Sequence, residues 1–318
     1  MKYIVTGGAG FVGSHVSDYL INQGHEVIVI DNLVTGKKEY LNSKAKFHQL
    51  DITDYNAIES LFRGVDGVFH LAALARIQPS FEDPDLYFRV NAIGTRNILA
   101  AAKKYGVKRV VYSASSSAYG QREDMPLHED DKVTAQSLHP YGSTKRMGEM
   151  LMRDLGKYTN GPETVCLRYF NVYGPRQSTT LDGPYATVIG IFCDLFKRGK
   201  SLPVVPDGHQ RRDFTWAGDV AAANYAAMTS PKVGNGEIIN IGTKQSYSIW
   251  DVAKLVWGAP QTATVEDMLK SGKCVMAPAR RGEVKETLAN ISRAKELLDW
   301  EPKMEFKEGI QRCLDSMK

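Results

Sequence analysis

Two residues that could form an acid–base pair, Tyr141 and Lys145, stand four positions apart near the middle of the chain. On a helix, side chains at this spacing lie one turn apart on the same face. A tyrosine with an ordinary pKa of about 10 is a poor base at neutral pH, but a neighbouring ammonium group stabilises the phenolate and lowers that pKa. The pair is therefore a candidate general base. Read alone, the motif also occurs by chance as a surface tyrosine beside a helical lysine.

A run of hydroxyl side chains follows the apolar segment 110–113, and it includes Ser113, Ser115, Ser116 and Ser117. Ligands of parallel sheets bind beyond the carboxyl ends of the strands, so we expect these serines to face a crevice. A polar turn is the alternative interpretation.

A glycine-rich segment near the start of the chain could bind a dinucleotide. Gly7, Gly10 and Gly13 stand between an apolar run at 3–5 and a helical pattern over 12–20. Glycine permits the tight turn, and the missing Cβ lets a pyrophosphate approach the backbone at the positive end of the helix. A glycine turn with no ligand is the alternative.

An acidic residue, Asp31, ends the next apolar run 18 positions after Gly13. A carboxylate at this place can accept hydrogen bonds from both hydroxyls of an adenosine ribose, and it repels a 2′-phosphate. The pattern therefore favours NAD over NADP, although Lys37 and Lys38 nearby could attract the extra phosphate.

Short, continuous apolar runs that alternate with helical patterns predict the elements that must position these groups. Runs of this kind occupy 3–5, 27–30, 68–71, 110–113 and 164–167. Strands without polar alternation are covered on both faces, so a doubly wound parallel α/β sheet of the Rossmann type is expected.

A long helix is predicted over 84–104, with Asp83 as its cap and Pro84 in its first turn. After about residue 170, glycine, proline and polar residues become frequent, and helical segments persist near 185–198, 217–229, 248–257 and 292–299. We therefore expect a dinucleotide-binding domain over 1–170. A smaller α/β substrate-binding region should occupy 171–318, with some segments returning to the sheet.

The composition excludes several classes of protein. The 318 residues carry 40 basic and 36 acidic side chains, a mixed surface that argues against a nucleic-acid partner. No apolar run approaches the ~18 residues that span a membrane, and the N-terminus leaves no room for a signal peptide before the glycines. The four cysteines form no CxxC pair, so no metal site is expected and a reducing cytoplasm is indicated.

The glycine spacing GxxGxxG resembles the extended short-chain dehydrogenase/reductase family. Nearly the whole chain is similar to its nucleotide-sugar epimerases, the UDP-galactose 4-epimerase group. Within that resemblance Ser115, Tyr141 and Lys145 are catalytic, and Ser115 hydrogen-bonds the reacting sugar hydroxyl. The resemblance implies NAD as cofactor, held by the residues Gly7, Gly10, Phe11, Val12, Gly13, Asp31, Asn32, Asp51, Ile52, Leu71, Ala72, Ala73, Asn91, Ser113, Tyr141, Lys145 and Tyr169.

The segments 167–176, 207–214 and 280–283 resemble the motifs that hold the nucleotide sugar in this group. The implied substrate residues are Ser115, Ser116, Asn171, Arg212, Arg280, Glu283 and Thr287. Arginines suit a diphosphate because a planar guanidinium binds its oxygens bidentately, although a single arginine read alone is more often part of a surface ion pair. Glu283 replaces the aspartate usual in the family.

Related dehydratases and decarboxylases carry a carboxylate at one or both positions after the catalytic serine, where this chain has Ser116 and Ser117. The resemblance therefore implies 4-epimerisation of a UDP-hexose. Tyr141 would take the proton of the sugar 4-hydroxyl while carbon 4 gives hydride to NAD, and hydride would return to the other face of a transient 4-keto sugar.

The expected substrates are UDP-glucose and UDP-galactose, with UDP-GlcNAc and UDP-GalNAc accepted because Thr287 is small at the position that gates the N-acetyl group in the family. Thr287 could instead simply pack in a strand. A UDP-glucuronate 4-epimerase, with Arg76 or Arg176 holding the carboxylate, and an idle NAD-binding regulator are the alternatives. The resemblance also implies a homodimer formed through helices near 84–104 and 141–157.

Overall fold

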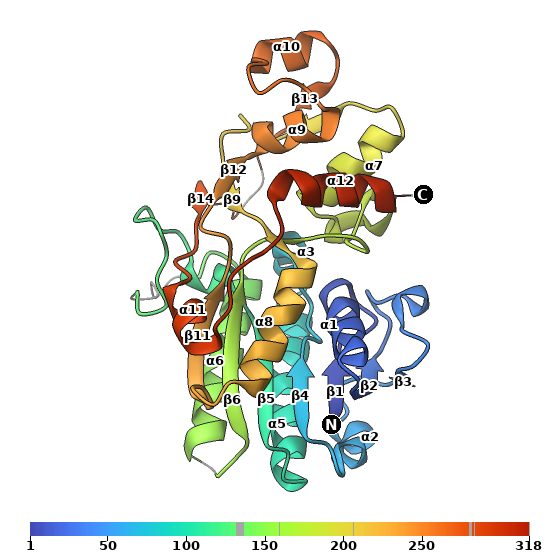
Figure 1. The fold of residues 1–318 in the computed structure, drawn as a ribbon, viewed down its shortest axis with the longest axis vertical. Coiled ribbons are helices and arrows are strands. Elements are labelled where there is room, and N and C mark those ends of the chain that lie inside the picture. The colour runs from blue at the N-terminus through green and yellow to red at the C-terminus, as the bar shows by residue number, and fades with distance from the viewer. Residues whose placement is uncertain (132–136, 159, 206, 280–281, 283, 318) are drawn as a thin grey trace.

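A parallel sheet of seven strands forms the centre of the lower part of the molecule in Figure 1. The computed structural model describes residues 1–131, 137–158, 160–205, 207–279, 282 and 284–317. The strand order is β11-β6-β5-β4-β1-β2-β3, and every neighbouring pair is parallel. The strands are β1 (Lys2–Thr6), β2 (Glu26–Asp31), β3 (Lys46–Gln49), β4 (Gly67–His70), β5 (Arg109–Ser115), β6 (Glu163–Tyr169) and β11 (Asn235–Ile241). The predicted doubly wound Rossmann-type sheet is confirmed.

The chain reverses its direction of progress across the sheet between β3 and β4. It builds β1, β2 and β3 outward on one side, then returns to place β4 on the other side of β1. In open parallel sheets a crevice for ligands forms beyond the carboxyl ends of the strands at this reversal. The glycine segment follows β1 and the segment 71–76 follows β4, so both lie at the crevice.

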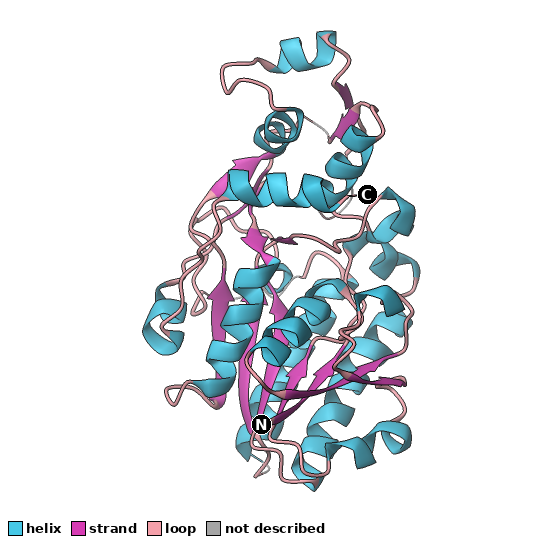
Figure 2. Cartoon of the chain, turned by 45° about the vertical axis from the view of Figure 1, so that its right-hand side comes forward, coloured by secondary structure: helices cyan, strands magenta, loops and turns pink. Residues whose placement is uncertain are grey.

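Helices cover both faces of the sheet (Figure 2). Alternate residues of β1 point to opposite sides: Tyr3 and Val5 belong to one apolar core, and Ile4 belongs to the other. The first core is covered by α1 (Phe11–Asn22) and α8 (Ala217–Thr229) and the second by α5 (Gly94–Lys104) and α6 (Pro140–Tyr158). The lower part also contains shorter helices: η1 (Lys38–Tyr40), α2 (Tyr55–Ile58), η2 (Glu59–Phe62), α3 (Ile77–Glu82), η4 (Ser116–Tyr119) and α11 (Ser292–Leu298).

The long helix predicted over 84–104 is present, but it is not uniform. It consists of α4 (Pro84–Phe88), a π-helical segment η3 (Arg89–Ile93) and α5. The expected cap is confirmed, because the Asp83 side chain accepts from the backbone N–H of Leu86. A π segment inside an α-helix has no periodicity signal of its own, and such segments are frequent at functional sites.

The upper part of the molecule in Figure 1 has its own apolar core. Its helices are α7 (Val188–Lys197), α9 (Ile249–Trp257), α10 (Val265–Lys270) and α12 (Phe306–Ser316), with the short helix η5 (Thr180–Tyr185). Two pairs of strands lie here, β7 (Val172–Tyr173) with β10 (Thr215–Trp216) and β8 (Leu202–Val204) with β13 (Cys274–Met276). A small three-stranded sheet is formed by β12 (Ser246–Ser248), β9 (Arg211–Asp213) and β14 (Glu286–Thr287), in that order. Residues after 171 also supply β11, α8 and α11 to the lower part, so the boundary at 170 stays a prediction.

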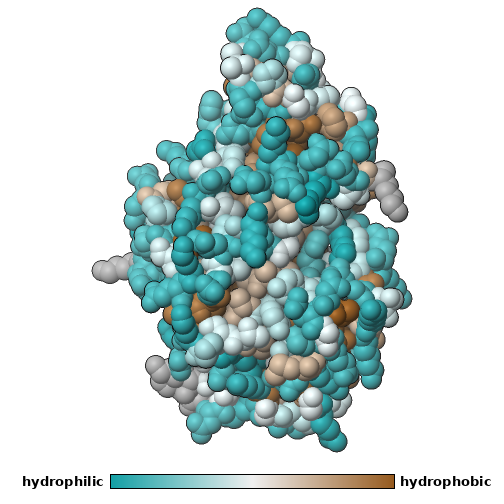
Figure 3. All heavy atoms as spheres, in the orientation of Figure 1, coloured by the Kyte–Doolittle hydropathy of each residue, from teal (hydrophilic) through white to brown (hydrophobic). Residues whose placement is uncertain are grey.

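The surface agrees with the nearly balanced charge of the chain. Hydrophilic residues cover most of the face shown in Figure 3, and hydrophobic residues appear there in small separate patches. Among the described helices, none is long and apolar enough to cross a membrane.

Candidate active site

A cavity of about 490 Å³ lies beyond the carboxyl ends of β1, β2, β4, β5 and β6. We call it the central cavity. Of the residues predicted to bind cofactor or substrate, those that line it are Gly7, Gly10, Phe11, Val12, Gly13, Asp31, Asn32, Asp51, Ile52, Leu71, Ala72, Ala73, Ser113, Ser115, Ser116, Tyr141, Lys145, Tyr169 and Asn171. The structure therefore brings together residues that span most of the first half of the chain.

The glycine turn at one end of the central cavity leaves no room for side chains. Gly7 has a φ of 71°, and a Cβ there would lie 2.7 Å from the backbone nitrogen of Ala72. A Cβ on Gly13 would lie 2.1 Å from the carbonyl oxygen of Gly7. The turn closes through a hydrogen bond from Gly10 N–H to Gly7 O at 3.0 Å, and α1 begins one residue later. This combination of bare backbone and helix N-terminus suits a pyrophosphate.

The Asp31 carboxylate stands at the end of β2, buried in the wall of the central cavity. It accepts from the backbone N–H groups of Ala9 at 3.0 Å and Leu33 at 2.8 Å. Burial raises the pKa of Asp31, and these two hydrogen bonds oppose the rise. Nearby, the ammonium group of Lys37 pairs with Asp182 at 2.9 Å, so that cation is already engaged.

The three predicted catalytic side chains meet at the carboxyl end of β5. The Ser115 side chain lies close enough to the Tyr141 hydroxyl to lower its pKa. The buried ammonium of Lys145 donates to the carbonyl of Ser113 at 2.7 Å and lies 5.0 Å from the centre of the Tyr112 ring. Both Tyr141 and Lys145 project from the first two turns of α6, as their spacing predicts.

Burial opposes the predicted lowering of the Tyr141 pKa. It raises the pKa of Tyr141, while the Ser115 side chain and the charge of Arg76 lower it. Burial also lowers the pKa of Lys145 to about 7, against the opposing effect of Glu149. Sequence spacing alone could not show that both groups lose solvation, which disfavours the charged form of each.

Asn91 was predicted to bind the cofactor, but it lies behind the wall of the central cavity instead of lining it. Its buried amide accepts from Leu74 N–H at 2.8 Å and donates to Leu74 O and to the Thr144 hydroxyl, each at 3.0 Å. Asn91 sits in the π segment η3, which turns this side chain toward the loop after β4 and toward α6. It therefore holds the wall in place.

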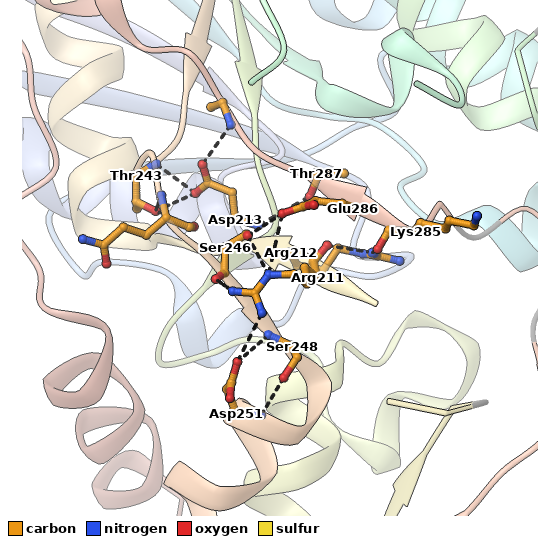
Figure 4. A network of polar contacts seen from close by, with 12 residues as sticks. Arg211, Arg212, Asp213, Thr243, Ser246, Ser248, Asp251, Lys285, Glu286 and Thr287 are labelled. Atoms are coloured by element: carbon orange, nitrogen blue, oxygen red, sulfur yellow. Dashed lines mark hydrogen bonds and ion pairs between the residues drawn. The ribbon is translucent and has the colours of Figure 1, made fainter. Parts of the chain in front are cut away.

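Asn171 is the predicted substrate residue that reaches the central cavity from the upper part (Figure 4 shows its neighbours). Its amide donates to Asp213 O and to the Thr287 hydroxyl, each at 3.0 Å. Thr287 and Arg212 lie on the small sheet β12-β9-β14 and are not among the residues that line the cavity. The Arg212 guanidinium donates to Arg211 O at 2.9 Å. Arg280 and Glu283, also predicted, lie outside the described residues.

Asp213 links the strands behind Asn171 (Figure 4). Its buried carboxylate accepts from Thr243 N–H at 2.8 Å, from the Thr243 hydroxyl at 2.7 Å and from Ala289 N–H at 3.1 Å. Burial raises its pKa to about 6. The Asp213 carboxylate thereby links β9 to the loop after β11 and to the residues that follow β14.

Several lining residues were missed by the prediction of cofactor and substrate contacts. Val34 and Thr35 follow β2, and Ile77 follows β4, so the rule that ligands lie beyond strand ends could have found them. Arg76, predicted only for the UDP-glucuronate alternative, also lines the cavity. Ser178 and Tyr185 had no such signal, because they come from the loop-rich part that folds back over the cavity. The Tyr185 carbonyl accepts from Arg76 Nε at 2.6 Å.

Comparison with known proteins finds relatives that act on nucleotide sugars. Residues 3–242 match the model of the NAD dependent epimerase/dehydratase family. A UDP-glucuronate 4-epimerase of Thermodesulfobacterium geofontis is 34% identical over 330 residues, which is 99% of this chain and 96% of that protein. The UDP-glucose 4-epimerase of Thermotoga maritima, solved with UDP-glucose, has a TM-score of 0.89 at 35% identity and 99% and 98% coverage.

A further solved structure extends the range of sugars among the relatives. The UDP-N-acetylglucosamine 4-epimerase of Methanobrevibacter ruminantium, in complex with UDP-N-acetylmuramic acid, has a TM-score of 0.87 at 32% identity. The alignment covers 99% of this chain and 97% of that one.

Proposed function

The chain belongs to the NAD dependent epimerase/dehydratase family, and on that premise we propose that it interconverts UDP-hexoses that differ at carbon 4. The observation that carries the proposal is the meeting of Ser115, Tyr141 and Lys145 in one cavity with the glycine turn and Asp31. Ser116 and Ser117 line the same cavity, and neither can shuttle a proton for dehydration as a carboxylate would. Relatives that are 4-epimerases of UDP-sugars support the assignment.

The residues present fit NAD. Cβ atoms on Gly7 and Gly13 would collide with backbone, so bare backbone faces the pyrophosphate, and Asp31 stands where the adenosine ribose hydroxyls need an acceptor. When bound, NAD supplies a hydride acceptor and donor for carbon 4 of the sugar. The cofactor is unchanged over a cycle, so tight retention is expected.

The chain's own residues move the proton. Tyr141 takes the proton of the sugar 4-hydroxyl, and the neighbouring Ser115 hydroxyl orients that sugar hydroxyl. Positive charge from Arg76 stabilises the phenolate against its burial. We expect the ammonium of Lys145, which lines the same cavity, to add to this effect. The resulting 4-keto sugar turns over within the cavity. Hydride then returns to the other face of carbon 4 while Tyr141 returns the proton to the 4-oxygen, which yields the epimer.

A panel of three sugars tests the function and its range. The purified protein is incubated separately with UDP-galactose, UDP-GalNAc and UDP-glucuronate, and the products are separated by anion exchange. We expect the 4-epimers of the first two. Failure to form any 4-epimer with a preparation that contains NAD would reject the proposal.

UDP-glucuronate is included because one observation favours a UDP-glucuronate 4-epimerase as the second candidate. Of the two arginines that could hold the sugar carboxylate, Arg76 lines the central cavity, whereas Arg176 pairs with Asp18 at 2.6 Å and is not a lining residue. Preferred turnover of UDP-glucuronate, reduced in an Arg76→Leu variant far more than the turnover of UDP-galactose, would establish that candidate.

Replacing Asp31 by alanine should weaken NAD retention at least about tenfold and narrow the preference over NADP. The change removes a charged hydrogen-bond acceptor for the ribose and also the repulsion of a 2′-phosphate. Dissociation constants for both nucleotides are measured by calorimetry on stripped protein. Asp66→Ala, which removes an exposed carboxylate at the other end of the sheet, is the control. If the Asp31 variant binds NAD as tightly as wild type, Asp31 is not a ribose ligand.

Enlarging Thr287 should select against N-acetylated sugars. The Thr287 hydroxyl accepts a hydrogen bond from Asn171, which lines the cavity. A tyrosine at position 287 would occupy the volume that an N-acetyl group needs. For Thr287→Tyr we expect kcat/KM for UDP-GlcNAc relative to UDP-glucose to fall by about tenfold or more, equivalent to about 1.4 kcal/mol. Thr287→Val keeps the side-chain volume but removes the acceptor of the Asn171 hydrogen bond. It therefore shows whether the size of residue 287 or its support of Asn171 sets the sugar preference. An unchanged ratio in the tyrosine variant would contradict the gate.

The proposed homodimer is supported by apolar side chains exposed on adjacent helices. Phe88 on α4, Ile93 on η3, and Met147 and Met150 on α6 are 46%, 40%, 40% and 49% exposed. We expect light scattering to give the mass of two chains, and the double variant Ile93→Glu/Met147→Glu to give one. A monomeric wild-type protein would contradict this. A cytoplasmic location is proposed as well, since all four cysteines are free and buried.

A further inference from the structure

A buried ion pair begins one helical turn after Lys145 on α6, at Glu149, and its partner is Arg168. The guanidinium of Arg168 contacts the Glu149 carboxylate with both arms, Nε to Oε1 at 2.7 Å and Nη2 to Oε2 at 2.8 Å. The two residues are only 1% and 4% exposed. The mechanism proposed above does not use either of them.

The pair is built into the elements that carry the catalytic residues. Tyr141, Lys145 and Glu149 follow one another at four-residue intervals, so they share one face of α6. Arg168 on β6 lies opposite Ala114 of β5, between the Ser113 whose carbonyl holds Lys145 and the Ser115 that contacts Tyr141.

Stability alone does not account for this ion pair. Burying two charges is costly, and apolar residues of similar volume are often as stable. The pair is also incompletely satisfied, because Arg168 Nη1 has no hydrogen-bond partner within the described part of the chain. The guanidinium lies instead over the Tyr119 ring at 4.4 Å. Because burying the Glu149 and Arg168 charges costs free energy, we infer that the charges serve a purpose other than stability.

Resting on the proposed function, we propose that Glu149 is a positioning residue that keeps the Lys145 ammonium charged beside the Tyr141 phenolate, and that Arg168 holds and moderates the Glu149 charge. Glu149 would thus act through Lys145 and would not touch the substrate. With a neutral Lys145, the phenolate loses a neighbouring cation at the pH where turnover is needed.

The other groups around Lys145 do not replace this charge. Tyr112 presents its ring on β5, and burial raises the pKa of its hydroxyl. His70 on β4 is buried and neutral, with a pKa lowered to about 3, and burial raises the pKa of the Cys166 thiol on β6. Among the described residues, Glu149 is the carboxylate that raises the pKa of Lys145, opposing the burial that brings it to about 7.

The test is a direct titration of Lys145 by NMR in the full-length NAD complex, with ¹³C at the lysine ε-carbons and the signal assigned through Lys145→Met. Glu149→Gln should lower the Lys145 pKa by about one unit or more, because it removes a nearby opposite charge. Arg168→Met should raise it, because the Glu149 charge is then no longer shared. Asp154→Asn removes a surface carboxylate from the same helix and should leave the pKa unchanged.

Opposite shifts in the two variants support the inference, since general damage would not move one pKa in two directions. If Glu149→Gln does not fold, the double variant Glu149→Gln/Arg168→Met carries the test and should also lower the Lys145 pKa. Glu149→Asp, which keeps the charge, should restore a nearly wild-type value. An unchanged Lys145 pKa in the variants that lack Glu149, or a shift in the same direction when Arg168 alone is replaced, overturns the inference.

Turnover provides the second readout and separates this inference from the proposed function. The alkaline limb of the pH profile for UDP-galactose should move to lower pH in Glu149→Gln, since Lys145 loses its proton sooner as pH rises. Wild-type protein without epimerase activity would reject the proposed function while leaving the NMR titration valid. If the wild type is active but its Lys145 pKa does not change when Glu149 is replaced, only the inference is rejected.

Discussion

Replacing Tyr141 by phenylalanine is expected to lower turnover of a UDP-hexose by about 10²–10⁴-fold, the usual cost of losing a general base. In the proposed mechanism the phenol oxygen takes the proton from the 4-hydroxyl, and phenylalanine keeps the ring while removing that oxygen. The ring also packs with its neighbours, parallel to His139 at 5.9 Å and edge-on to Tyr87 at 6.3 Å, so the wall of the cavity should be preserved. NAD content should therefore match that of wild type.

The matched control is Tyr87→Phe. Tyr87 is buried on the adjacent helix α4, with its ring edge-on to Tyr141, and its hydroxyl has no hydrogen-bond partner within the described ranges. Losing that hydroxyl should change kcat by less than about threefold. A Tyr141→Phe preparation, free of wild type, that turns over at the rate of the control would exclude Tyr141 as the base.

Replacing Gly13 by alanine is expected to weaken NAD binding by two orders of magnitude or more, on the order of 3 kcal/mol. The new Cβ would lie 2.1 Å from Gly7 O and 2.9 Å from the Cα of Gly8, and both contacts are with backbone that cannot rotate away. The glycine turn must open, which destroys the surface that meets the pyrophosphate.

Gly24→Ala is the control for this second prediction. Gly24 ends the same helix with a φ of 80°, and a Cβ there meets nothing within 4 Å. Its replacement should cost about 1 kcal/mol of stability, because an alanine is strained in that conformation, but NAD binding should not change. Calorimetry on stripped protein and thermal melts distinguish the two effects. Equal NAD affinity in Gly13→Ala and wild type would mean that the turn does not hold the pyrophosphate.

The core of the fold was predictable because its central strands are short, continuous apolar runs. The first predicted run, 3–5, lies inside β1, and the predicted helix 217–229 has the bounds of α8. β3 was missed because Lys46 and Gln49 are exposed at the edge of the sheet, where no apolar run is required. β11 was missed because it returns from the later, loop-rich half of the chain, and no local pattern encodes that long-range pairing.

The site was predictable where a motif binds through its backbone or through a fixed helical spacing. The glycine turn and the pair Tyr141 and Lys145 are of this kind, and both line the central cavity. Burial is a property of the assembled fold, so the sequence could not show that burial raises the pKa of Tyr141. For the same reason spacing could not show that Asn91 supports the wall or that Tyr185 reaches the cavity.

The central claim is that hydride leaves carbon 4 and returns to it within one closed cavity. Its most direct test supplies UDP-galactose deuterated at carbon 4 to the purified protein, with no added nucleotide, and follows the products by NMR. We predict UDP-glucose that retains the deuterium at carbon 4, together with NAD released when the protein is denatured. UDP-glucose in which that deuterium has exchanged with solvent hydrogen, or no UDP-glucose from protein shown to contain NAD, would contradict the account.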